Sequence, residues 1–357
     1  MAAAELWAGV VGQERAVALL DGAARQPVHA YLFVGPAGSG KRAAARAFAA
    51  ALVCADGGDG TCRDCRLALA GEHPDVREVE RVGAAITVEQ AGEIVRLAAL
   101  APVEGARKVM ILDEFHLLQP PAAAKLLKTV EEPPPSTVFC ILADDVPAEL
   151  VTIASRCMRV ELRRLTDDTV RETLVAEGVE LDTAALAAHA SGGDLDRARL
   201  LAADPALALR RKAFAELPDR LDGNGATVAA AVDELLGLIE GAAAPLQTRH
   251  EAELAALEER VAQVGERGSG RKATEDRQKR ELRRHRVDEL RAGLGTLAAT
   301  YRDELVRGSA RPADATAAVQ DVHAALEALE RNPNESLLLQ ALFLRLPPAP
   351  VSLRSPS

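Results

Sequence analysis

Short apolar runs alternate with helical patterns from residue 11 to about residue 165. The runs that predict strands are 31–34 (YLFV), 109–112 (VMIL), 138–143 (VFCILA) and 158–162 (MRVEL). Amphipathic segments with helical spacing lie between them. Buried apolar strands separated by helices are typical of a parallel sheet covered by helices on both faces. The pattern therefore predicts an α/β domain at residues 1–165.

The rest of the chain has a helical pattern. Residues 166–204 contain short helical segments interrupted by Gly178 and by the turn SGGD, and they predict a small helical lid. Residues 205–346 show no strand pattern and predict an all-α domain. We expect the Pro-rich residues 347–357 to form a flexible tail.

Two amphipathic patterns in the all-α domain flank a polar stretch. The apolar positions, spaced by three or four residues, are Leu254, Leu257, Val261 and Val264, then Leu290, Leu294, Leu297, Tyr301 and Leu305. Residues 265–286 between them are polar and basic. We expect a long charged helical hairpin over about 248–308, joined through a basic hinge. A basic run is usually a solvated face, and contact with DNA is the alternative.

Composition narrows the class of protein. The chain of 357 residues is 48% hydrophobic but only 3% aromatic, so its cores must be built mainly from Ala, Leu and Val. No signal-peptide pattern opens the sequence, and no apolar run approaches the roughly 18 residues of a membrane span. We therefore expect a cytoplasmic protein whose five Cys are thiols or metal ligands. With a net charge of -10, it would meet nucleic acid through a local patch or through partners.

The segment GPAGSGK matches a phosphate-binding loop between a predicted strand and a predicted helix. Gly35, Gly40 and Lys41 are in register, with Gly38 between them. Backbone N–H groups and a helix N-terminus can surround a phosphate chain there, with Lys41 as a point charge. Arg42, however, replaces the Ser or Thr whose hydroxyl would hold Mg²⁺. Nucleotide binding is therefore predicted, and metal binding is in doubt.

An acidic pair follows the predicted strand 109–112. Asp113 at a strand end can orient a Mg²⁺-bound water, and Glu114 can act as a base on an attacking water. The alternative is that the pair only caps a helix. With the phosphate-binding loop, these residues complete a candidate nucleotide site.

Several motifs follow one another in a family-specific order. They are VVGQ (10–13), HAYLF (29–33), GPAGSGK (35–41), a Cys cluster before HPDV (73–76), LDEFH (112–116), KLLKTVEEPP (125–134) and SRC (155–157). This order resembles the bacterial DNA polymerase III clamp-loader AAA+ family, strongly over the first 165 residues. Residues 332–347 resemble the last helix of the delta-prime subunits, and gamma/tau is the competing relative. The resemblance implies an AAA+ domain at 1–165 and an oligomerising helical collar at 205–346.

The resemblance also implies roles for individual residues. The family has ATP sites at subunit interfaces, and SRC implies that Arg156 is a catalytic arginine finger acting in trans. Such a charge is worth ~10³ to 10⁵ in rate where it has been measured. Two acidic residues, Asp144 and Asp145, stand where the family has neutral side chains, and a carboxylate repels a γ-phosphate. In the lid, Arg197 fits the delta-prime pattern better than a motor arginine near Asp196. These departures, with Arg42, imply weak or vestigial binding of ATP and Mg²⁺.

The Cys cluster at 54–65 resembles the zinc knuckle of the family, which has a fourth Cys. The position corresponding to that Cys is Asp59, and zinc accepts an oxygen ligand. The preferred ligand set is therefore Cys54, Asp59, Cys62 and Cys65. His73 is the reserve fourth ligand, and a knuckle that has lost its metal is the alternative. Of the other thiols, Cys140 is expected in the core and Cys157 in the SRC turn.

The resemblance predicts a delta-prime-like subunit, a largely non-hydrolysing stator that completes a neighbour's ATP site in DNA replication. Its implied partners are gamma/tau and delta subunits in a hetero-oligomeric ring, with the sliding clamp and primed DNA reached through the complex near the nucleoid. An active gamma/tau-like motor is the alternative favoured by Lys41, Asp113 and Glu114. A further alternative is an unrelated AAA+ adaptor whose basic hinge binds nucleic acid.

Overall fold

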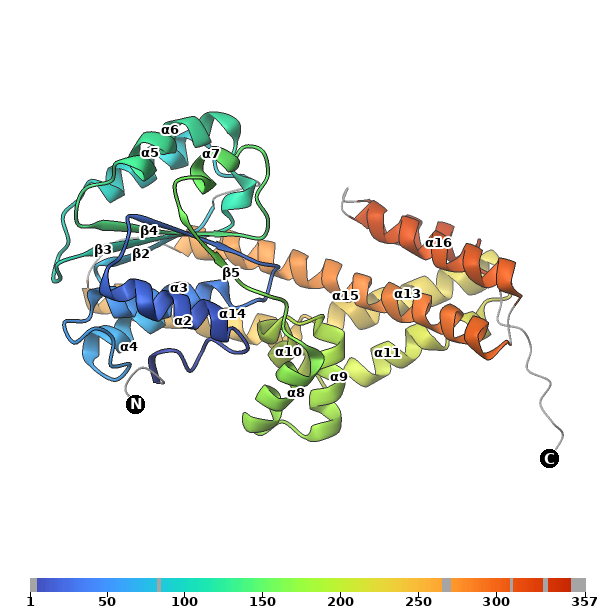
Figure 1. Ribbon diagram of the computed structural model, residues 1–357. Coiled ribbons are helices and arrows are strands. Elements are labelled where there is room, and N and C mark those ends of the chain that lie inside the picture. The colour runs from blue at the N-terminus through green and yellow to red at the C-terminus, as the bar shows by residue number, and fades with distance from the viewer. Residues whose placement is uncertain (1–4, 82–84, 265–270, 309–310, 330–332, 348–357) are drawn as a thin grey trace. The chain divides into compact units, whose positions relative to one another are not determined.

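A parallel five-stranded sheet forms the centre of the first unit of the chain, Met1–Arg199 (Figure 1). In the computed structural model, residues 5–81, 85–264, 271–308, 311–329 and 333–347 are described. The strands are β1 (Ala30–Val34), β2 (Val76–Val79), β3 (Lys108–Leu112), β4 (Thr137–Ala143) and β5 (Met158–Glu161), in the order β2-β3-β4-β1-β5. Every residue of β3 and β4 is buried, as expected for strands covered on both faces.

Helices cover both faces of this sheet. On one face lie α2 (Glu14–Arg25), α3 (Lys41–Val53) and α4 (Arg63–Ala70); on the other lie α5 (Val88–Ala98), α6 (Pro120–Glu131) and α7 (Val151–Ala154) (Figure 1). The 3₁₀ helix η1 (Phe115–Leu117) follows β3. Small alanines on α3 allow the helix to lie close to the sheet, where Phe48 meets Tyr31 edge-on with ring centroids 4.5 Å apart.

A group of short helices follows the sheet. They are α8 (Asp167–Ala176), α9 (Leu181–Ser191) and α10 (Leu195–Ala202). The side chain of Thr166 accepts the N–H of Thr169 at the start of α8, and Gly192 ends α9 with a φ of 63°. Local sequence signals therefore set these helix ends.

The second unit, Leu200–Ser357, is helical throughout its described residues. Its helices are α11 (Leu207–Ala215), α12 (Leu217–Arg220), α13 (Gly225–Gly241), α14 (Ala244–Val264), α15 (Arg271–Arg307), α16 (Pro312–Leu329) and α17 (Glu335–Phe343). Apolar faces of α11, α13, α15, α16 and α17 form one core. Of the positions predicted from helical spacing on α15, Leu290, Leu294, Leu297 and Tyr301 are buried in it, whereas Leu305 is only half-buried.

The predicted fold class is confirmed: an α/β domain with a parallel sheet covered by helices on both faces is followed by short helices and an all-α region. Sequence patterning missed β2, because its VREV sequence alternates and only Val76 is buried. The basic residues 271–286, predicted as part of a hinge, instead belong to α15. Residues 265–270 and most of the predicted tail, 348–357, lie outside the described residues. None of the described helices is long and apolar enough to cross a membrane.

Candidate functional site

The phosphate-binding loop connects the end of β1 to the first residue of α3. Gly38 and Gly40 have φ angles of 73° and 84°, which glycine adopts without strain. A Cβ at Gly38 would lie 2.1 Å from the Cγ of Asp194, so the turn before α10 packs directly on the loop. The loop thus has the expected backbone but little free space at its tip.

Lys41 is held entirely by groups of its own chain. Its Nζ donates to the carbonyls of Gly35 at 2.6 Å and Pro36 at 2.8 Å, and to Asp144 Oδ1 at 2.8 Å. These contacts engage all of the protons that a lysine ammonium can donate. Of the two acidic residues singled out in the sequence, Asp144 therefore faces the loop, whereas Asp145 is exposed.

The Arg42 guanidinium bridges two carboxylates at the ends of neighbouring strands. Its Nη1 lies 2.9 Å from Glu80 Oε1, and its Nη2 donates to Asp113. The pairing of Val79 with Leu112 brings Glu80 and Asp113 side by side. Burial alone would lower the pKa of Arg42, but the charges of Asp113 and Glu80 outweigh it and raise the pKa above its ordinary value. A permanent cation thus contacts the carboxylate predicted to orient a Mg²⁺-bound water.

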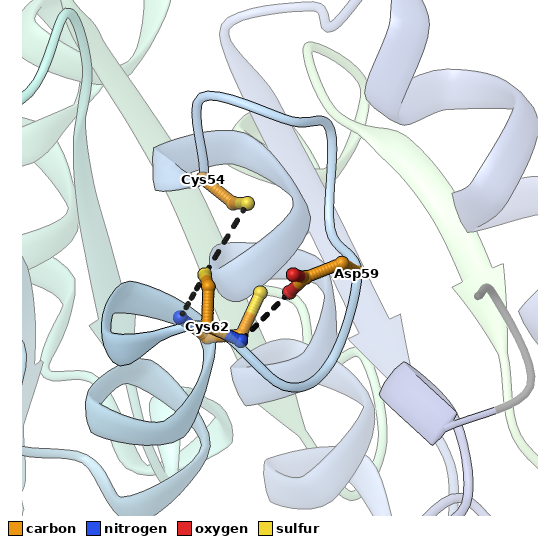
Figure 2. Close-up of side chains that lie close together, drawn as sticks. Cys54, Asp59 and Cys62 are labelled. Carbon is orange, nitrogen blue, oxygen red and sulfur yellow. Dashed lines mark hydrogen bonds between the residues drawn. The ribbon is translucent and has the colours of Figure 1, made fainter.

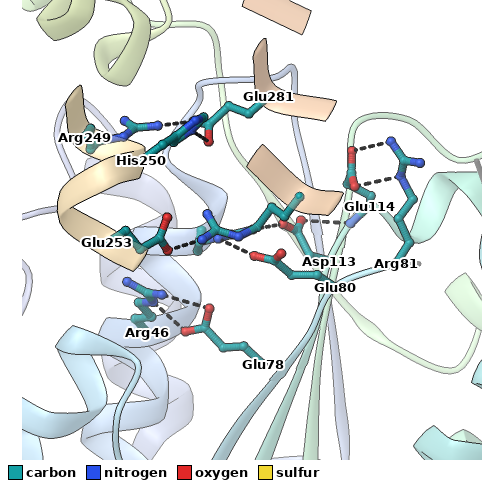
Figure 3. A network of polar contacts seen from close by, with 12 residues as sticks. Arg46, Glu78, Glu80, Arg81, Asp113, Glu114, Arg249, His250, Glu253 and Glu281 are labelled. Atoms are coloured by element: carbon teal, nitrogen blue, oxygen red, sulfur yellow. Dashed lines mark hydrogen bonds and ion pairs between the residues drawn. The ribbon is translucent and has the colours of Figure 1, made fainter. Parts of the chain in front are cut away.

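Glu114 is paired in the same manner. Arg81 Nε lies 2.7 Å from Glu114 Oε2, and Arg81 Nη2 donates to Oε1 at 3.3 Å (Figure 3). The backbone of Glu114 has a φ of 50°, and its N–H donates to Asp113 Oδ1 at 2.8 Å. Its side chain makes no capping bond to η1, so Glu114 itself does not cap that helix.

A cavity of about 390 Å³ adjoins the loop within the first unit. Its lining includes Val10 from the N-terminal segment, Arg42 and Arg46 from α3, and Asp196 from α10. The volume is within the range of small-molecule sites. The Arg46 Nη2 donates to Glu78 Oε2 at 2.9 Å (Figure 3), so both cavity arginines are already paired with carboxylates.

The lid arginine contacts the lid itself. Arg197 Nη1 donates to the carbonyl of Ala190 at 2.6 Å, and its backbone N–H donates to Asp194 Oδ1 at 3.0 Å. Asp196 is exposed and pairs with Arg199 at 3.0 Å. Arg197 therefore bonds within the lid, whereas Asp196 also lines the cavity beside Arg42.

Arg156 lies in the turn between α7 and β5. Its Nη1 donates to the carbonyl of Thr152 at 2.9 Å and to Ser155 Oγ at 3.2 Å, while its Nε lies 3.3 Å from Glu131 Oε1. The side chain is 32% exposed. Among the described residues, none of its hydrogen bonds or ion pairs reaches Lys41 or Asp113. The structure therefore brings the loop and acidic residues together and places Arg156 elsewhere.

The predicted metal ligands converge on one point. Cys54 ends α3, Cys62 begins α4, and the ligand atoms of Cys54, Asp59, Cys62 and Cys65 all lie within 4.8 Å of one another (Figure 2). Cys54 Sγ and Cys62 Sγ are 3.6 Å apart. Three thiols and one carboxylate at such short separations are a donor set that fits tetrahedral zinc.

Asp59 has the backbone environment of a metal-binding residue in a knuckle. Its Oδ1 accepts the N–H groups of Thr61 at 2.9 Å and Cys62 at 3.0 Å, and Cys62 Sγ accepts the N–H of Cys65 at 3.4 Å. The bonds from Cys62 and Thr61 lower the pKa of Asp59 and keep it ionised. Both ligand atoms thus accept an N–H from three residues further along.

His73 belongs to a different cluster, with Asp64 and Glu104. Its Nδ1 accepts the N–H of Asp75 at 3.0 Å, which places the proton of the neutral ring on Nε2. That Nε2 lies 3.9 Å from Asp64 Oδ1. Because Asp59, and not His73, lies with the three thiols, the geometry favours Asp59 as the fourth ligand.

Sequence reasoning missed the residues that pair with this machinery, namely Glu80, Arg81 and Glu131. Glu80 follows the strand that patterning overlooked, and Arg81 comes next to it. Glu131 lies within the motif KLLKTVEEPP, which gave it no role of its own. Recognising that β2 pairs with β3 would have identified Glu80 as a neighbour of Asp113. No local sequence signal identifies the contacts of Arg81 and Glu131.

Comparison with known proteins shows that the first unit is similar to subunits of DNA polymerase III. Residues 12–166 match the family model described as DNA polymerase III, delta subunit. The chain is 40% identical over 144 residues to DNA polymerase III subunit delta' of Pseudomonas aeruginosa, covering 39% of this chain and 44% of that protein. It is 36% identical over 205 residues to subunit tau of Bacillus subtilis, covering 54% of this chain and 36% of that protein. The chain thus spans less than half the length of these relatives.

A solved Thermotoga maritima protein related to the DNA polymerase III gamma subunit is 18% identical, with a TM-score of 0.43. The comparison covers 91% of this chain and 96% of that one.

Proposed function

The chain belongs to the clamp-loader AAA+ family of bacterial DNA polymerase III, and from this premise we propose that it is a delta-prime-like stator. In this role the subunit hydrolyses ATP weakly or not at all. It supplies Arg156 as an arginine finger to a neighbouring ATPase subunit during loading of the sliding clamp.

The contact between Arg42 and Asp113 carries this proposal. In a complete site, a loop hydroxyl and an acidic residue hold Mg²⁺ against the phosphates. Here a guanidinium occupies the hydroxyl position and is paired with that acidic residue, and Lys41 is paired with Asp144. Nucleotide binding would have to break both ion pairs. This arrangement supports weak or vestigial binding of ATP and Mg²⁺.

The surroundings of Arg156 support a role in trans. Exposed apolar side chains lie on either side of it in sequence: Val151 is 54% exposed and Met158 is 39% exposed. Arginine beside exposed apolar surface is typical of protein interfaces. A neighbouring gamma/tau subunit would bring its own nucleotide to this surface.

The proposed partners are gamma/tau and delta subunits in a hetero-oligomeric ring, with the sliding clamp and primed DNA reached through the complex. A cytoplasmic location beside the nucleoid follows from that role. Leu337 on α17 is 63% exposed and Leu344, which caps the C-terminus of this helix, is 52% exposed; residues seven apart share a helix face. This apolar face supports a collar contact with another subunit.

We also propose that Cys54, Asp59, Cys62 and Cys65 hold a structural Zn²⁺. The ion would join the end of α3 to the start of α4 and contribute to folding rather than to chemistry.

A gamma/tau-like motor is the second candidate, favoured by the retained Lys41, Asp113 and Glu114 and by the match to subunit tau. The adaptor hypothesis is less well supported, because cations of the basic run are paired with α14. Arg271 contacts Glu258, and Arg277 contacts Glu253.

ATPase assays of the isolated chain and of a complex reconstituted with cognate gamma/tau and delta subunits test the proposal. The isolated chain should show no appreciable Mg²⁺-dependent turnover. In the complex, Arg156→Ala should lower the turnover stimulated by clamp and primed DNA, and Lys41→Ala should have much less effect. Robust hydrolysis by the isolated chain, lost in Lys41→Ala, would establish the motor instead. Salt-sensitive nucleic-acid binding without partners would favour the adaptor.

A further inference from the structure

Hydrogen bonds hold the Arg156 guanidinium at Nη1, and a carboxylate lies beside its Nε. Its Nε faces Glu131, and its Nη1 donates to Thr152 and Ser155. Among the described residues, no hydrogen bond or ion pair engages Nη2. The guanidinium is therefore oriented before any partner binds, with one pair of N–H donors still available.

Glu131 is well placed to provide this anchor. It is the last residue of α6, whose end is followed by Glu132 and then by three prolines that cannot continue the helix. A side chain on the end of a regular helix is held more precisely than one on a loop. The carboxylate that contacts Arg156 thus comes from a rigid element, whereas Arg156 itself lies in a turn.

The Glu131–Arg156 pair contributes little to the stability of the fold. The two side chains are 50% and 32% exposed, and exposed ion pairs are weak. The pair places a negative charge 3.3 Å from Nε, and although Nε makes no hydrogen bond, that charge favours the orientation in which the guanidinium keeps this nitrogen beside Glu131.

We propose that Glu131 is a positioning residue for Arg156, which directs the free Nη2 edge toward a phosphoryl group bound by the neighbouring subunit. The proposal rests on the proposed function, in which Arg156 acts in trans. An orienting carboxylate matters most in the transition state, where preorganised donors meet developing charge.

The test compares Glu131→Gln with Glu132→Gln in the reconstituted clamp-loader complex. The control removes the same charge from the adjacent exposed residue, for which the structure records no side-chain contact with Arg156. Glu131→Gln should lower the kcat of ATP turnover stimulated by clamp and primed DNA by about two- to fivefold, the effect expected of one exposed ion pair. The KM for ATP should not change, because the neighbour's own loop binds the nucleotide. Glu132→Gln should behave as the native chain.

A double variant separates positioning from a general structural effect. In the Arg156→Ala background, Glu131→Gln should cause no further loss of kcat. The single variant Glu131→Gln should have the thermal unfolding midpoint and the assembly of the native chain. A normal or raised kcat in Glu131→Gln, while Arg156→Ala lowers it, would overturn this inference alone. No effect of Arg156→Ala would overturn the proposed function itself.

Discussion

At the scale of single residues, Arg42 changes the contacts of the charged groups around the phosphate-binding loop. A hydroxyl there would leave Asp113 free to face a metal ion, whereas the guanidinium contacts Asp113 and Glu80. The Arg42 guanidinium is thus a permanent cation at this position. In a motor subunit, Mg²⁺ would bind there together with the nucleotide. The other elements of a nucleotide site, including the loop backbone and Lys41, are still present.

Replacing Arg42 should therefore recover some metal-dependent binding. We expect Arg42→Thr to strengthen Mg²⁺-ATP binding by the isolated chain about tenfold, which is about 1.4 kcal/mol, because it frees Asp113 and supplies a hydroxyl. Isothermal titration calorimetry with and without Mg²⁺ measures the effect. Arg46→Thr is the matched control, since it lies one turn further along α3 and pairs with Glu78. Equal affinities of the two variants would contradict the interpretation of Arg42.

The metal-binding cluster gives a second prediction at this scale. We expect about one Zn²⁺ per chain in freshly purified protein, because the donor set is that of a structural zinc site. Cys62→Ser and Asp59→Ala should release the ion and destabilise the knuckle, and Asp59→Cys should retain it. His73→Gln should keep its zinc, because His73 belongs to another cluster. Elemental analysis decides between these outcomes, and protein without zinc would refute the site.

At the scale of elements, charge pairing joins α14 to α15. His250 Nε2 lies 2.9 Å from Glu281 Oε2, and Arg249 contacts the same carboxylate (Figure 3). Sequence reasoning assigned this basic stretch to a hinge because it lacks an apolar face. Arg, Lys, Gln and Glu are nevertheless good helix formers, and partners on α14 neutralise part of the charge. Helix propensity and pairing explain the continuous α15.

Glu281 makes the stability of this helix pair dependent on pH. Burial alone would raise the pKa of Glu281, but His250 and Arg249 outweigh it and hold the pKa below its ordinary value of 4.5. The ionised group thus contributes stability above that value, and the contribution is lost as the pH falls below it. We expect Glu281→Gln to destabilise α14 and α15 by about 1 kcal/mol at neutral pH.

Hydrogen exchange of amides in α14 and α15 measures this difference. The difference in the free energy of helix opening between Glu281→Gln and the native chain should become smaller as the pH falls below 4.5, because the native carboxyl then also becomes neutral. Glu251→Gln, at an exposed position of α14, is the control. It should change neither the free energy of helix opening nor its dependence on pH. A difference that does not depend on pH would exclude the ion pairs as its cause.

Patterning recovered β1, β3, β4 and β5 because their apolar runs are nearly continuous. It missed β2, an edge strand with polar positions, and with it the approach of Glu80 to Arg42. The motifs identified Lys41, Arg42, Asp113 and the Cys cluster from local spacing. They could not show which carboxylate each cation contacts, since those pairs join residues far apart in the chain. Strand register and helix packing decide such contacts.

At the scale of the whole molecule, the two units carry different parts of the proposed role. The family match covers residues 12–166, within the first unit, and the all-α unit lies beyond it. The loop, the proposed zinc ligands and Arg156 all belong to the first unit, whereas the exposed Leu337 and Leu344 belong to the second. Assembly and catalytic support should therefore be separable by mutation.

We expect the double variant Leu337→Asp/Leu344→Asp to weaken association with gamma/tau and delta subunits at least about tenfold, because charge would replace apolar side chains at the proposed contact. The isolated variant should fold normally, since both leucines are more than half exposed. Val306→Asp, at a position 81% exposed on α15, is the control. Size-exclusion chromatography of the mixtures reports the result, and normal co-elution of the double variant would exclude this face from the collar.

The ion pairs of Lys41 and Arg42 also bear on how the subunit would respond to the energy state of the cell. The free energy by which a ligand stabilises a fold grows with the logarithm of the ratio of its concentration to its dissociation constant. With both cations satisfied by carboxylates of the same chain, we expect physiological ATP to shift the melting temperature very little. In the proposed ring, Arg156 would then be presented in the same form when ATP is abundant and when it is scarce. The neighbour's nucleotide would then set the timing of each hydrolysis, because the conformation of this subunit would not change through the cycle.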